Sequence, residues 1–423
     1  MKRSDLTKIL QPELPNPNGF GVAKGKTPSL KNIWFVVPPP PSETTPGGLD
    51  PKLLSDAHEV ISQLPSLKVV TELDRLVLGL LVRREAVQSS RMEGTWSTIE
   101  QVLTPGELHD RREKSARASV IGYAHALESA FLRASTKGQA VFTKDLLRTM
   151  HKEMMSRDPD FRGPPGKFRH EIGQGIYATI GGFDRPENST FNPVPPEFIN
   201  KCLKHNLSWY QNEQLVELSQ AGMGPSLIVR MARGHWHFEA VHPFTDGNGR
   251  VGRMLMALQM VCENYSPLYL SGFIETHKKA YGEFLRKAQM KLDEAPLIHF
   301  LAEAIVECWE ESQKTKKALM SLPETWLNRG RFREGSAAKR SMEVLLGMPI
   351  VTIKTFQNLL EISQPAAKRA IDQLQSHKIL RERTGLSRNR VFAAEEVIEI
   401  LARPFRSPIE HALNKAWAVL GLK

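Results

Sequence analysis

The chain has 423 residues, with 57 Lys plus Arg against 46 Asp plus Glu, and so a formal net charge of +11. This length predicts two or three domains with full hydrophobic cores, which excludes a small scaffold that depends on disulfides. A composition with 41% hydrophobic and 24% charged residues is that of an ordinary globular protein and excludes a disordered or fibrous chain. No apolar run approaches the roughly 18 to 20 residues that a membrane span requires, so we expect no membrane partner.

The cysteines and the first residues predict a cytoplasmic location. Residues 1–5 are basic but no apolar stretch follows them, so we expect no secretory signal. Three cysteines, Cys202, Cys262 and Cys308, are odd in number and scattered, which suits a reducing compartment and gives neither a disulfide framework nor a metal-knuckle spacing.

The positive charge is concentrated in the last quarter of the chain. Residues 323–423 carry 17 basic and 10 acidic side chains, whereas the middle of the chain is nearly neutral. A nucleic-acid or acidic partner should therefore be sought in the tail.

In chain order, residues 1–50 are rich in Pro and Gly and predict an extended arm that docks on the body. From residue 52 onward, apolar residues at spacings of three and four predict helices. The expected helices cover residues 52–64, 73–92, 116–136, 143–156, 196–212, 225–240, 250–260 and 275–318, and Pro196 and Pro225 are expected in the first turns of their helices.

An irregular segment, residues 163–195, interrupts the helices and is dense in Gly, Pro, Asn and Thr. Its strand-like piece is Tyr177, Ala178, Thr179 and Ile180. A long irregular segment inside a helical domain is typical of a functional loop, although a plain surface loop is the alternative.

The tail has a different pattern. Residues 352–360 and 364–377 predict two short helices with a turn at residues 362–363. Residues 380–385 and 388–392 then predict a two-stranded wing, so the tail has the layout of a winged helix-turn-helix.

The chemically informative segment is HPFTDGNGRVGR, residues 242–253. A helix ends near Ala240 and another begins near Arg250, with a glycine-rich loop between them. Backbone N–H groups at such a helix N-terminus bind phosphate, and Gly247 and Gly249 allow a close approach of the backbone. Arg250 and Arg253 lie on one helical face and can hold two phosphate groups.

Two further side chains extend this interpretation. Asp246, a hard oxygen ligand beside a polyphosphate, suits Mg²⁺. His242 precedes the loop, where a neutral imidazole can take a proton from an attacking hydroxyl. Each residue alone has an ordinary structural explanation, but their order within twelve residues favours a nucleotide site. A zinc site at His235 and His237 is disfavoured, because residues two apart on a helix face different directions.

This segment resembles the signature of the Fic family, HPFx(D/E)GNGRxxR, at every fixed position. The resemblance implies an all-helical core, a short β-hairpin flap, and transfer of AMP from ATP to a protein hydroxyl with Mg²⁺. His242 would be the base that deprotonates a Ser, Thr or Tyr, and Asp246 would hold the metal. Gly249 favours AMP transfer, since family members that transfer phosphate typically have lysine there. The other implied nucleotide-binding residues are Gly247, Asn248, Gly249, Arg250, Gly252 and Arg253, with Phe244 as the anchor of the loop. Tyr281 is a candidate for packing the adenine, with a buried core tyrosine as the alternative.

The same resemblance assigns two more segments. A flap hairpin that pairs with the target peptide corresponds to Tyr177–Gly182. The family's inhibitory pattern (S/T)xxxE(G/N) matches Ser89 to Gly94. Ser89 and Glu93 share one face of the predicted helix, and Gly94 ends that helix. The resemblance implies that Glu93 pairs with Arg253 and so displaces ATP from its productive pose.

The predicted organisation is a Pro/Gly-rich arm at 1–50, helices with the inhibitory motif at 51–110, a catalytic core at 111–320, and a winged-helix domain with a C-terminal helix at 321–423. The leading hypothesis is an autoinhibited protein adenylyltransferase with ATP and a protein as its partners. Alternatives are a DNA-binding regulator whose core senses nucleotide, and removal of AMP by the same site. DNA binding by the tail and a homodimer stay open.

Overall fold

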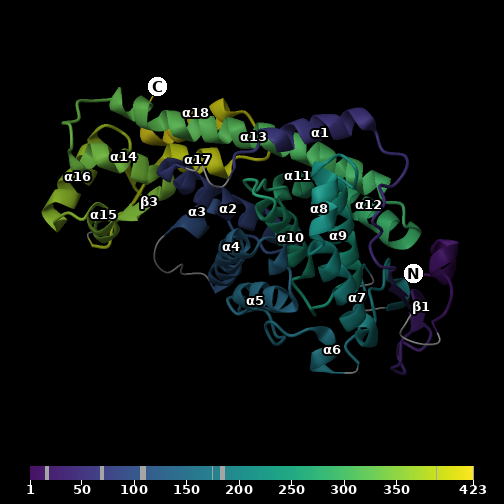
Figure 1. The fold of residues 1–423 in the computed structure, drawn as a ribbon. Coiled ribbons are helices and arrows are strands. Elements are labelled where there is room, and N and C mark those ends of the chain that lie inside the picture. The colour runs from purple at the N-terminus through teal and green to yellow at the C-terminus, as the bar shows by residue number, and fades with distance from the viewer. Residues whose placement is uncertain are drawn as a thin grey trace. The chain divides into compact units, whose positions relative to one another are not determined.

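The computed structural model is mainly helical, with a few short strands, which confirms the predicted fold class (Figure 1). It describes every residue except 15–18, 67–70, 105–110, 174, 182–185, 387 and 423, and only the backbone of residues 72, 111 and 112. Among the described residues, no helix is long and apolar enough to cross a membrane.

The chain divides into two compact units that do not follow chain order. Unit 1 comprises Met1–Lys68 and Gly122–Glu307, and unit 2 comprises Val69–Ile121 and Cys308–Lys423. Two of the three boundaries fall inside long helices, α4 (Arg111–Lys137) and α13 (Ala295–Leu327), and the third lies between residues 68 and 69. The predicted segment 51–110 therefore contributes residues to both units.

Unit 1 is organised around α9, a helix whose residues are all buried. It packs against α7, α10, α12 and β2, and Figure 1 shows α9 and α10 side by side. The helices of this unit, besides its part of α4 and α13, are α1 (Pro51–Gln63), α5 (Lys144–Met155), α6 (Arg169–Ile172), α7 (Pro196–Tyr210), α8 (Glu213–Gln220), α9 (Leu227–Val241), α10 (Asn248–Cys262), α11 (Ser271–Thr276) and α12 (Lys278–Lys291).

Capping residues explain why several helix starts could be predicted. The Asp50 carboxylate accepts a hydrogen bond from the Lys52 N–H, and the Thr143 hydroxyl caps α5 in the same way. Pro196 occupies the first turn of α7, as expected. The prediction for Pro225 is wrong, because Ser226 is the N-cap of α9 and Pro225 precedes it.

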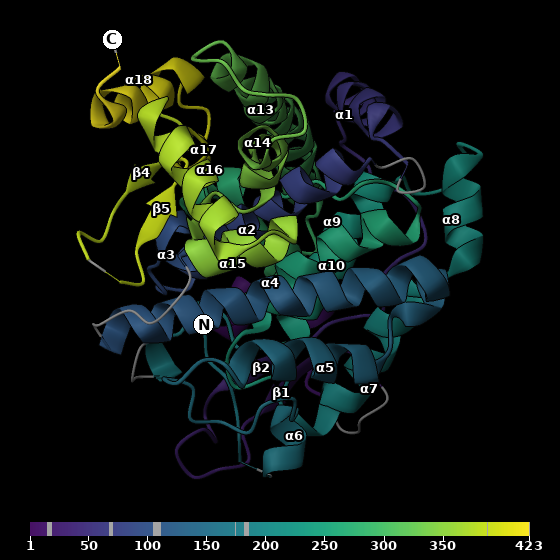
Figure 2. The same cartoon turned by 90° about the vertical axis from the view of Figure 1, so that its left-hand side faces the viewer.

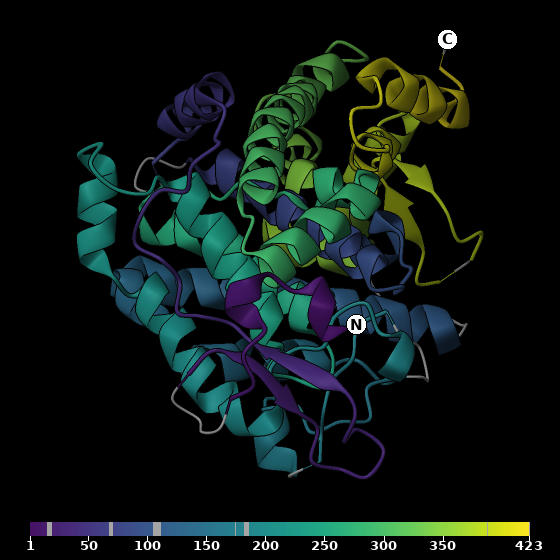
Figure 3. The same ribbon diagram turned by 90° about the vertical axis from the view of Figure 1, so that its right-hand side faces the viewer.

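The N-terminal arm folds into an antiparallel hairpin of β1 (Gly21–Lys24) and β2 (Trp34–Val37), drawn in purple in Figure 3. Phe35, Val36 and Val37 are buried, so the arm docks on unit 1 through apolar contacts. The sequence predicted docking but not this hairpin, since its strands are short and separated by a polar loop.

The predicted flap residues form one antiparallel bridge, between Ile180 and Phe191. The Ile180 N–H donates to the Phe191 carbonyl at 2.8 Å, and the next residue, Asn192, accepts from the Val36 N–H of β2 at 2.9 Å. The flap and the N-terminal hairpin are thus connected by backbone hydrogen bonds. Gly182, the last residue of the predicted flap, lies outside the described residues.

Unit 2 combines an early helical segment with the tail. Its helices, besides parts of α4 and α13, are α2 (Glu72–Met92), α3 (Ile99–Leu103), α14 (Ala337–Gly347), α15 (Ile353–Leu360), α16 (Gln364–Ser376), α17 (Glu395–Ala402) and α18 (Ile409–Leu420), and its strands are β3 (Ile350–Thr352), β4 (Arg381–Glu382) and β5 (Val391–Ala393). The strands form a sheet in the order β3-β5-β4, of which Figure 2 labels β4 and β5. The two short tail helices are confirmed to within one residue at each end.

Buried ion pairs connect the early helices of unit 2 to its tail. Glu311 on α13 pairs with Arg84 on α2 at 2.9 Å and with Arg403, the residue after α17, at 2.7 Å. Removing one partner of such a cluster leaves a buried charge without compensation, which costs about 3 to 5 kcal/mol. Helix α2 is therefore fixed to the tail within this unit.

Candidate active site

The turn that carries His242 ends α9 in a left-handed conformation. His242 is the C-cap, with φ 48° and ψ 60°, and its N–H donates to the Phe238 carbonyl at 2.9 Å. A residue with a Cβ pays roughly 1 to 2 kcal/mol for this conformation, so tertiary contacts must hold it. The helix ends one residue later than the sequence predicted.

The loop after His242 is fixed by the side chain of Asn248, the first residue of α10. Its amide oxygen accepts from the Phe244 N–H and its amide nitrogen donates to the Phe244 carbonyl, both at 2.9 Å. Because both amide atoms are used, the side chain of Asn248 is occupied by the loop rather than directed at a ligand. The sequence predicted a phosphate contact for Asn248. Because its side chain is occupied, only its backbone N–H is left for that contact.

Gly247 is required by both conformation and space. It has φ +77°, and a Cβ there would lie 3.0 Å from the Met154 side chain and 3.1 Å from the Met155 sulfur. Its N–H donates to Asp246 Oδ1 at 2.6 Å. We therefore expect phosphate to meet the N–H groups of the first turn of α10, next to the half-exposed Gly249.

A buried histidine supports the loop from below. The His151 ring stacks on Phe244 with centroids 3.9 Å apart, and its Nδ1 accepts from the Gly166 N–H at 2.8 Å. Nε2 must then carry the proton, which it donates to the Asp246 carbonyl at 3.1 Å. Burial lowers the pKa of His151 to about 4, so the ring is neutral at pH 7.

The two arginines of the motif are both buried on α10. Arg250 lies 3.5 Å from Asp158 and 3.7 Å from Asp246, measured between guanidinium nitrogen and carboxylate oxygen. Arg253 lies one turn further along the same helix. The first turn of α10 and both arginines therefore lie within one short segment of the chain.

Asp246 fits the role of a ligand for Mg²⁺. Its side chain is 61% exposed, and only Oδ1 is used by the backbone of Gly247. Mg²⁺ prefers one or two carboxylates together with phosphate oxygens, and Asp246 supplies one carboxylate beside the phosphate-binding turn.

His242 reaches the surface beside this turn. Its side chain is 20% exposed, and its Nδ1 lies 3.9 Å from Glu239 Oε2 one turn earlier on α9. Glu239 also explains Gly252, because a Cβ at 252 would lie 2.3 Å from Glu239 Oε1 and 3.1 Å from the His235 ring. Gly252 is thus a packing residue between α9 and α10.

Tyr281 is a buried residue of α12. Its hydroxyl lies 2.6 Å from His235 Nε2, and only 7% of the residue is exposed. Contact with an adenine would need movement of this side chain, so the structure favours the core role that the sequence had left as the alternative.

The residues of the inhibitory pattern lie in unit 2, at the end of α2. Ser89 is buried, α2 ends at Met92, and Glu93 is its C-cap with an exposed side chain. Gly94 follows with φ +85°, and the Thr95 N–H donates to the Ser90 carbonyl at 3.0 Å. The predicted helix end, with Gly94 as its terminator, is confirmed.

Sequence reasoning missed three residues of this site: His151, Arg169 and Glu239. His151 and Arg169 lie more than 70 residues before the motif. Arg169 sits in a Gly- and Pro-rich segment, and nothing in that segment marks it. Glu239 is three residues before His242 on the same helix, and this i, i+3 spacing could have indicated it.

The architecture and the loop define a helical protein in which a histidine at the end of one helix is followed by a glycine-rich loop and the N-terminus of the next helix. Comparison with known families is consistent with this description: the model of the Fic/DOC family matches residues 141–260, and the model of the Fic/DOC family N-terminal region matches residues 51–132. The chain is a Fic domain protein.

Curated relatives carry adenylyltransferase names. Protein adenylyltransferase fic-1 of Caenorhabditis elegans is 25% identical over 65% of this chain and 50% of its own length. Protein adenylyltransferase Fic of Culex quinquefasciatus is 32% identical over 44% of this chain and 31% of its own length. The chain spans 50% of the length of the first relative and 31% of the length of the second.

Solved structures give weaker similarities. A Fic family protein from Desulfovibrio desulfuricans G20 aligns with a TM-score of 0.48 at 19% identity, covering 84% of this chain and 98% of that protein. Fic-1 residues 134–508 from C. elegans align with a TM-score of 0.47 at 22% identity, covering 62% of this chain and 70% of that protein.

Proposed function

We propose that this chain is a protein adenylyltransferase that moves AMP from ATP to a hydroxyl side chain of a target protein. The hydroxyl oxygen forms a bond to the α-phosphorus, the bond from that phosphorus to the bridging β-oxygen breaks, and pyrophosphate leaves. The supporting observation is the placement of His242, which reaches the surface in a fixed left-handed turn directly before the phosphate-binding turn of α10.

His242 takes the proton of the attacking hydroxyl. Glu239, 3.9 Å from Nδ1, favours the tautomer with its proton on that nitrogen, so Nε2 accepts. A positioned base of this kind contributes about 10²- to 10⁴-fold to a rate.

The nucleotide phosphates bind at the first turn of α10. The N–H groups of Asn248 and Gly249, the helix dipole and Arg250 face the α- and β-phosphates, while Arg253 holds the γ-phosphate. Asp246 would hold Mg²⁺, which would neutralise charge on the phosphate oxygens.

The target docks beside the flap. Ile180 turns its N–H and carbonyl toward residues 190–191, and in an extended segment the neighbouring Thr179 directs its backbone groups the other way. Pairing with Tyr177–Ile180 by main chain would present a target hydroxyl with little demand on sequence.

Glu93 restrains this activity from the end of α2. The proposal rests on the match of Ser89 to Gly94 with the inhibitory pattern, and on a helix end that leaves the Glu93 side chain exposed. Loss of the Arg253 clamp would misalign the α-phosphate, and a shift of about 1 Å costs on the order of 100-fold in rate.

The test uses the Glu93→Gly chain with α-labelled and γ-labelled ATP, Mg²⁺ and a cell lysate. The proposal expects label on protein from α-labelled ATP only, and no label from the Glu93→Gly, His242→Ala double variant. Label from γ-labelled ATP, or none from either, would refute it. Loss of AMP from pre-labelled protein on addition of the unsubstituted chain would favour the reverse reaction.

A second candidate function is DNA binding by the tail. The order α14, β3, α15, α16, β4, β5 is the order of a winged helix-turn-helix, in which α16 would be the recognition helix. Lys368 and Arg369 are exposed on α16, whereas Ala367, Ile371 and Leu374 are buried.

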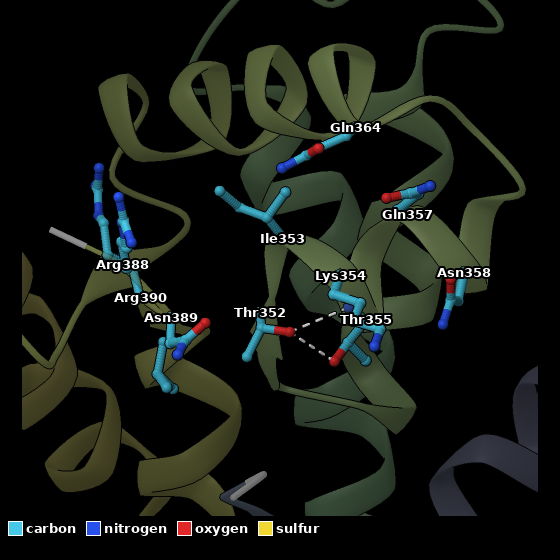
Figure 4. A pocket seen from close by; sticks show the side chains of 11 residues that line it. Thr352, Ile353, Lys354, Thr355, Gln357, Asn358, Gln364, Arg388, Asn389 and Arg390 are labelled. Atoms are coloured by element: carbon cyan, nitrogen blue, oxygen red, sulfur yellow. Dashed lines mark hydrogen bonds between the residues drawn. The ribbon is translucent and has the colours of Figure 1, made fainter. Parts of the chain in front are cut away.

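A polar groove supports this candidate. It has a volume of about 840 Å³ and lies between α15, the start of α16 and the wing (Figure 4). Lys354, Arg388 and Arg390 supply positive charge, and none of the eleven lining residues is acidic. Such a surface fits a phosphodiester backbone, with amide side chains such as Gln364 and Asn389 as further donors.

Fluorescence anisotropy with a short DNA duplex tests this candidate. An Arg388→Ala, Arg390→Ala chain should bind more weakly, with the slope of log affinity against log salt reduced by about 2. The matched control replaces the exposed Lys314 and Lys317 of α13 and should change neither. Equal loss in both variants would mean general charge attraction, and no binding by the unsubstituted chain would favour a protein partner.

A further inference from the structure

Arg169 is a buried arginine at the first position of α6, only 1% exposed. Its own N–H donates to the Pro243 carbonyl at 2.7 Å, so its backbone already contacts the catalytic loop. It stands 73 residues before His242 in sequence.

The guanidinium of Arg169 donates to four backbone carbonyls. Nε donates to His242 at 2.8 Å and Nη2 to Val241 at 3.2 Å, which are the last residues of α9 and its turn. Nη1 donates to Ile176 at 3.0 Å, directly before the flap residues. Nη2 also donates to Val194 at 2.8 Å, three residues after Phe191, the bridge partner of Ile180.

All four acceptors are neutral, and Arg169 forms no ion pair with any residue in the described part of the chain. Burying a cation without a carboxylate is costly, and burial lowers its pKa to about 9. An apolar side chain would avoid this cost but would leave the four carbonyls without the hydrogen bonds that Arg169 donates. The cost is offset only where fixing these four carbonyls matters.

We infer that Arg169 is a positioning residue that couples the turn of His242 to the two segments that meet at the Ile180–Phe191 bridge, through Ile176 before the flap and Val194 after Phe191. Its planar guanidinium fixes two parts of the site at once. One is the left-handed turn that orients the catalytic base, and the other is the segment that aligns the target hydroxyl. This inference deepens the proposed adenylyltransferase activity and rests on it.

The geometry requires arginine. A guanidinium offers five N–H donors in a rigid fork, whereas a lysine ammonium is a point charge with three rotatable donors on a longer flexible stem. Lysine at 169 would keep the charge but could not reach both the His242 and the Ile176 carbonyl in fixed directions.

The experiment compares Arg169→Lys and Arg169→Gln with a matched control, all in the Glu93→Gly background. The control is Arg230→Lys, a buried arginine near the other end of α9 that pairs with Glu263 at 2.7 and 2.8 Å. AMP transfer gives kcat and KM, calorimetry gives ATP affinity, and hydrogen exchange reports on residues 176–180 and 241–244.

We expect both Arg169 variants to lose on the order of 100-fold in kcat, with ATP affinity within about threefold of the parent. Exchange should rise together at 176–180 and 241–244. Arg230→Lys should lower the melting temperature while leaving kcat and the exchange of those two segments unchanged.

Three results would overturn the inference: a kcat within threefold of the parent, an exchange increase in one segment only, or failure of both Arg169 variants to fold where Arg230→Lys folds. The last result would make Arg169 a general stability residue. If the Glu93→Gly parent transfers no AMP, the proposed function fails, while hydrogen exchange still decides whether Arg169 couples the two segments.

Discussion

Two helix ends in this molecule carry the residues of interest, and they are built in opposite ways. Helix α9 of unit 1 ends at His242 in a left-handed turn held by the Arg169 guanidinium and followed by a loop stacked on His151. Helix α2 of unit 2 ends at Glu93, where Gly94 takes φ +85° and a Cβ on Gly94 would meet nothing within 4 Å.

The two helix ends differ in how the turn after each helix is determined. A catalytic base must stay within a fraction of an ångström of its productive position, so its turn is determined by several tertiary contacts. The turn after α2 is marked by local sequence, because Gly94 takes φ +85° directly after the C-cap Glu93. Glu93, the residue proposed to restrain the enzyme, lies at this end.

The largest expected effect comes from removing the base. His242→Ala in the Glu93→Gly background should reduce AMP transfer by about 10²- to 10⁴-fold, with ATP affinity nearly unchanged. Initial rates with α-labelled ATP and calorimetric ATP binding check this. A loss of ATP affinity as large as the loss of rate would assign His242 to binding instead.

Substitution at the other helix end, that of α2, should increase the rate of AMP transfer. Glu93→Gly should raise AMP transfer on the order of 100-fold, because the γ-phosphate clamp is released. The control is Glu361→Gly, an exposed glutamate at the C-cap of α15 in the same unit, with φ 52°. Similar gains in both variants would show that glycine at any helix end of unit 2 has this effect.

A smaller effect is expected from changing the packing between α9 and α10 at Gly252. Gly252→Ala should lower the free energy of unfolding by about 1 to 3 kcal/mol, since its Cβ would clash with Glu239. Gly282→Ala on α12, where a Cβ meets nothing within 4 Å, should instead stabilise by about 0.5 to 1 kcal/mol. Denaturant unfolding of both variants measures the contrast, and equal changes would disprove it.

The smallest effect concerns pH. The folded-state pKa of His151 is about 4, below the ordinary value of 6.5, so the unfolded chain takes up the proton first. Its contribution to stability is complete above about pH 6.5 and is lost as the pH falls toward 4, by at most about 1.4 kcal/mol per pH unit.

His151→Gln isolates this term, because an amide can replace both ring hydrogen bonds but does not titrate. As the pH falls from 6.5 to 4, the free energy of unfolding of this variant should decrease less steeply than that of the unsubstituted chain. The difference in slope should be at most about 1.4 kcal/mol per pH unit, which corresponds to one proton. Identical slopes would mean that His151 is not the titrating group.

The sequence by itself determined the helices whose caps and periodicity lie within a few residues, such as α1 with Asp50 and α2 with Gly94. It also determined the order of base, carboxylate, glycines and arginines at 242–253, because that constellation is contiguous. These features depend on short-range physics, namely side-chain caps, positive φ at glycine and helical spacing.

Only the tertiary structure decided which groups hold that segment in place. His151 and Arg169 contact the loop across sequence separations of more than 70 residues, and Asn248 proved to bind the loop rather than to face solvent. The sequence also did not predict the division into two units. Helices α4 and α13 are each continuous, yet the two ends of each helix belong to different units. Buried polar partners satisfy one another through space, and local periodicity carries no record of that pairing.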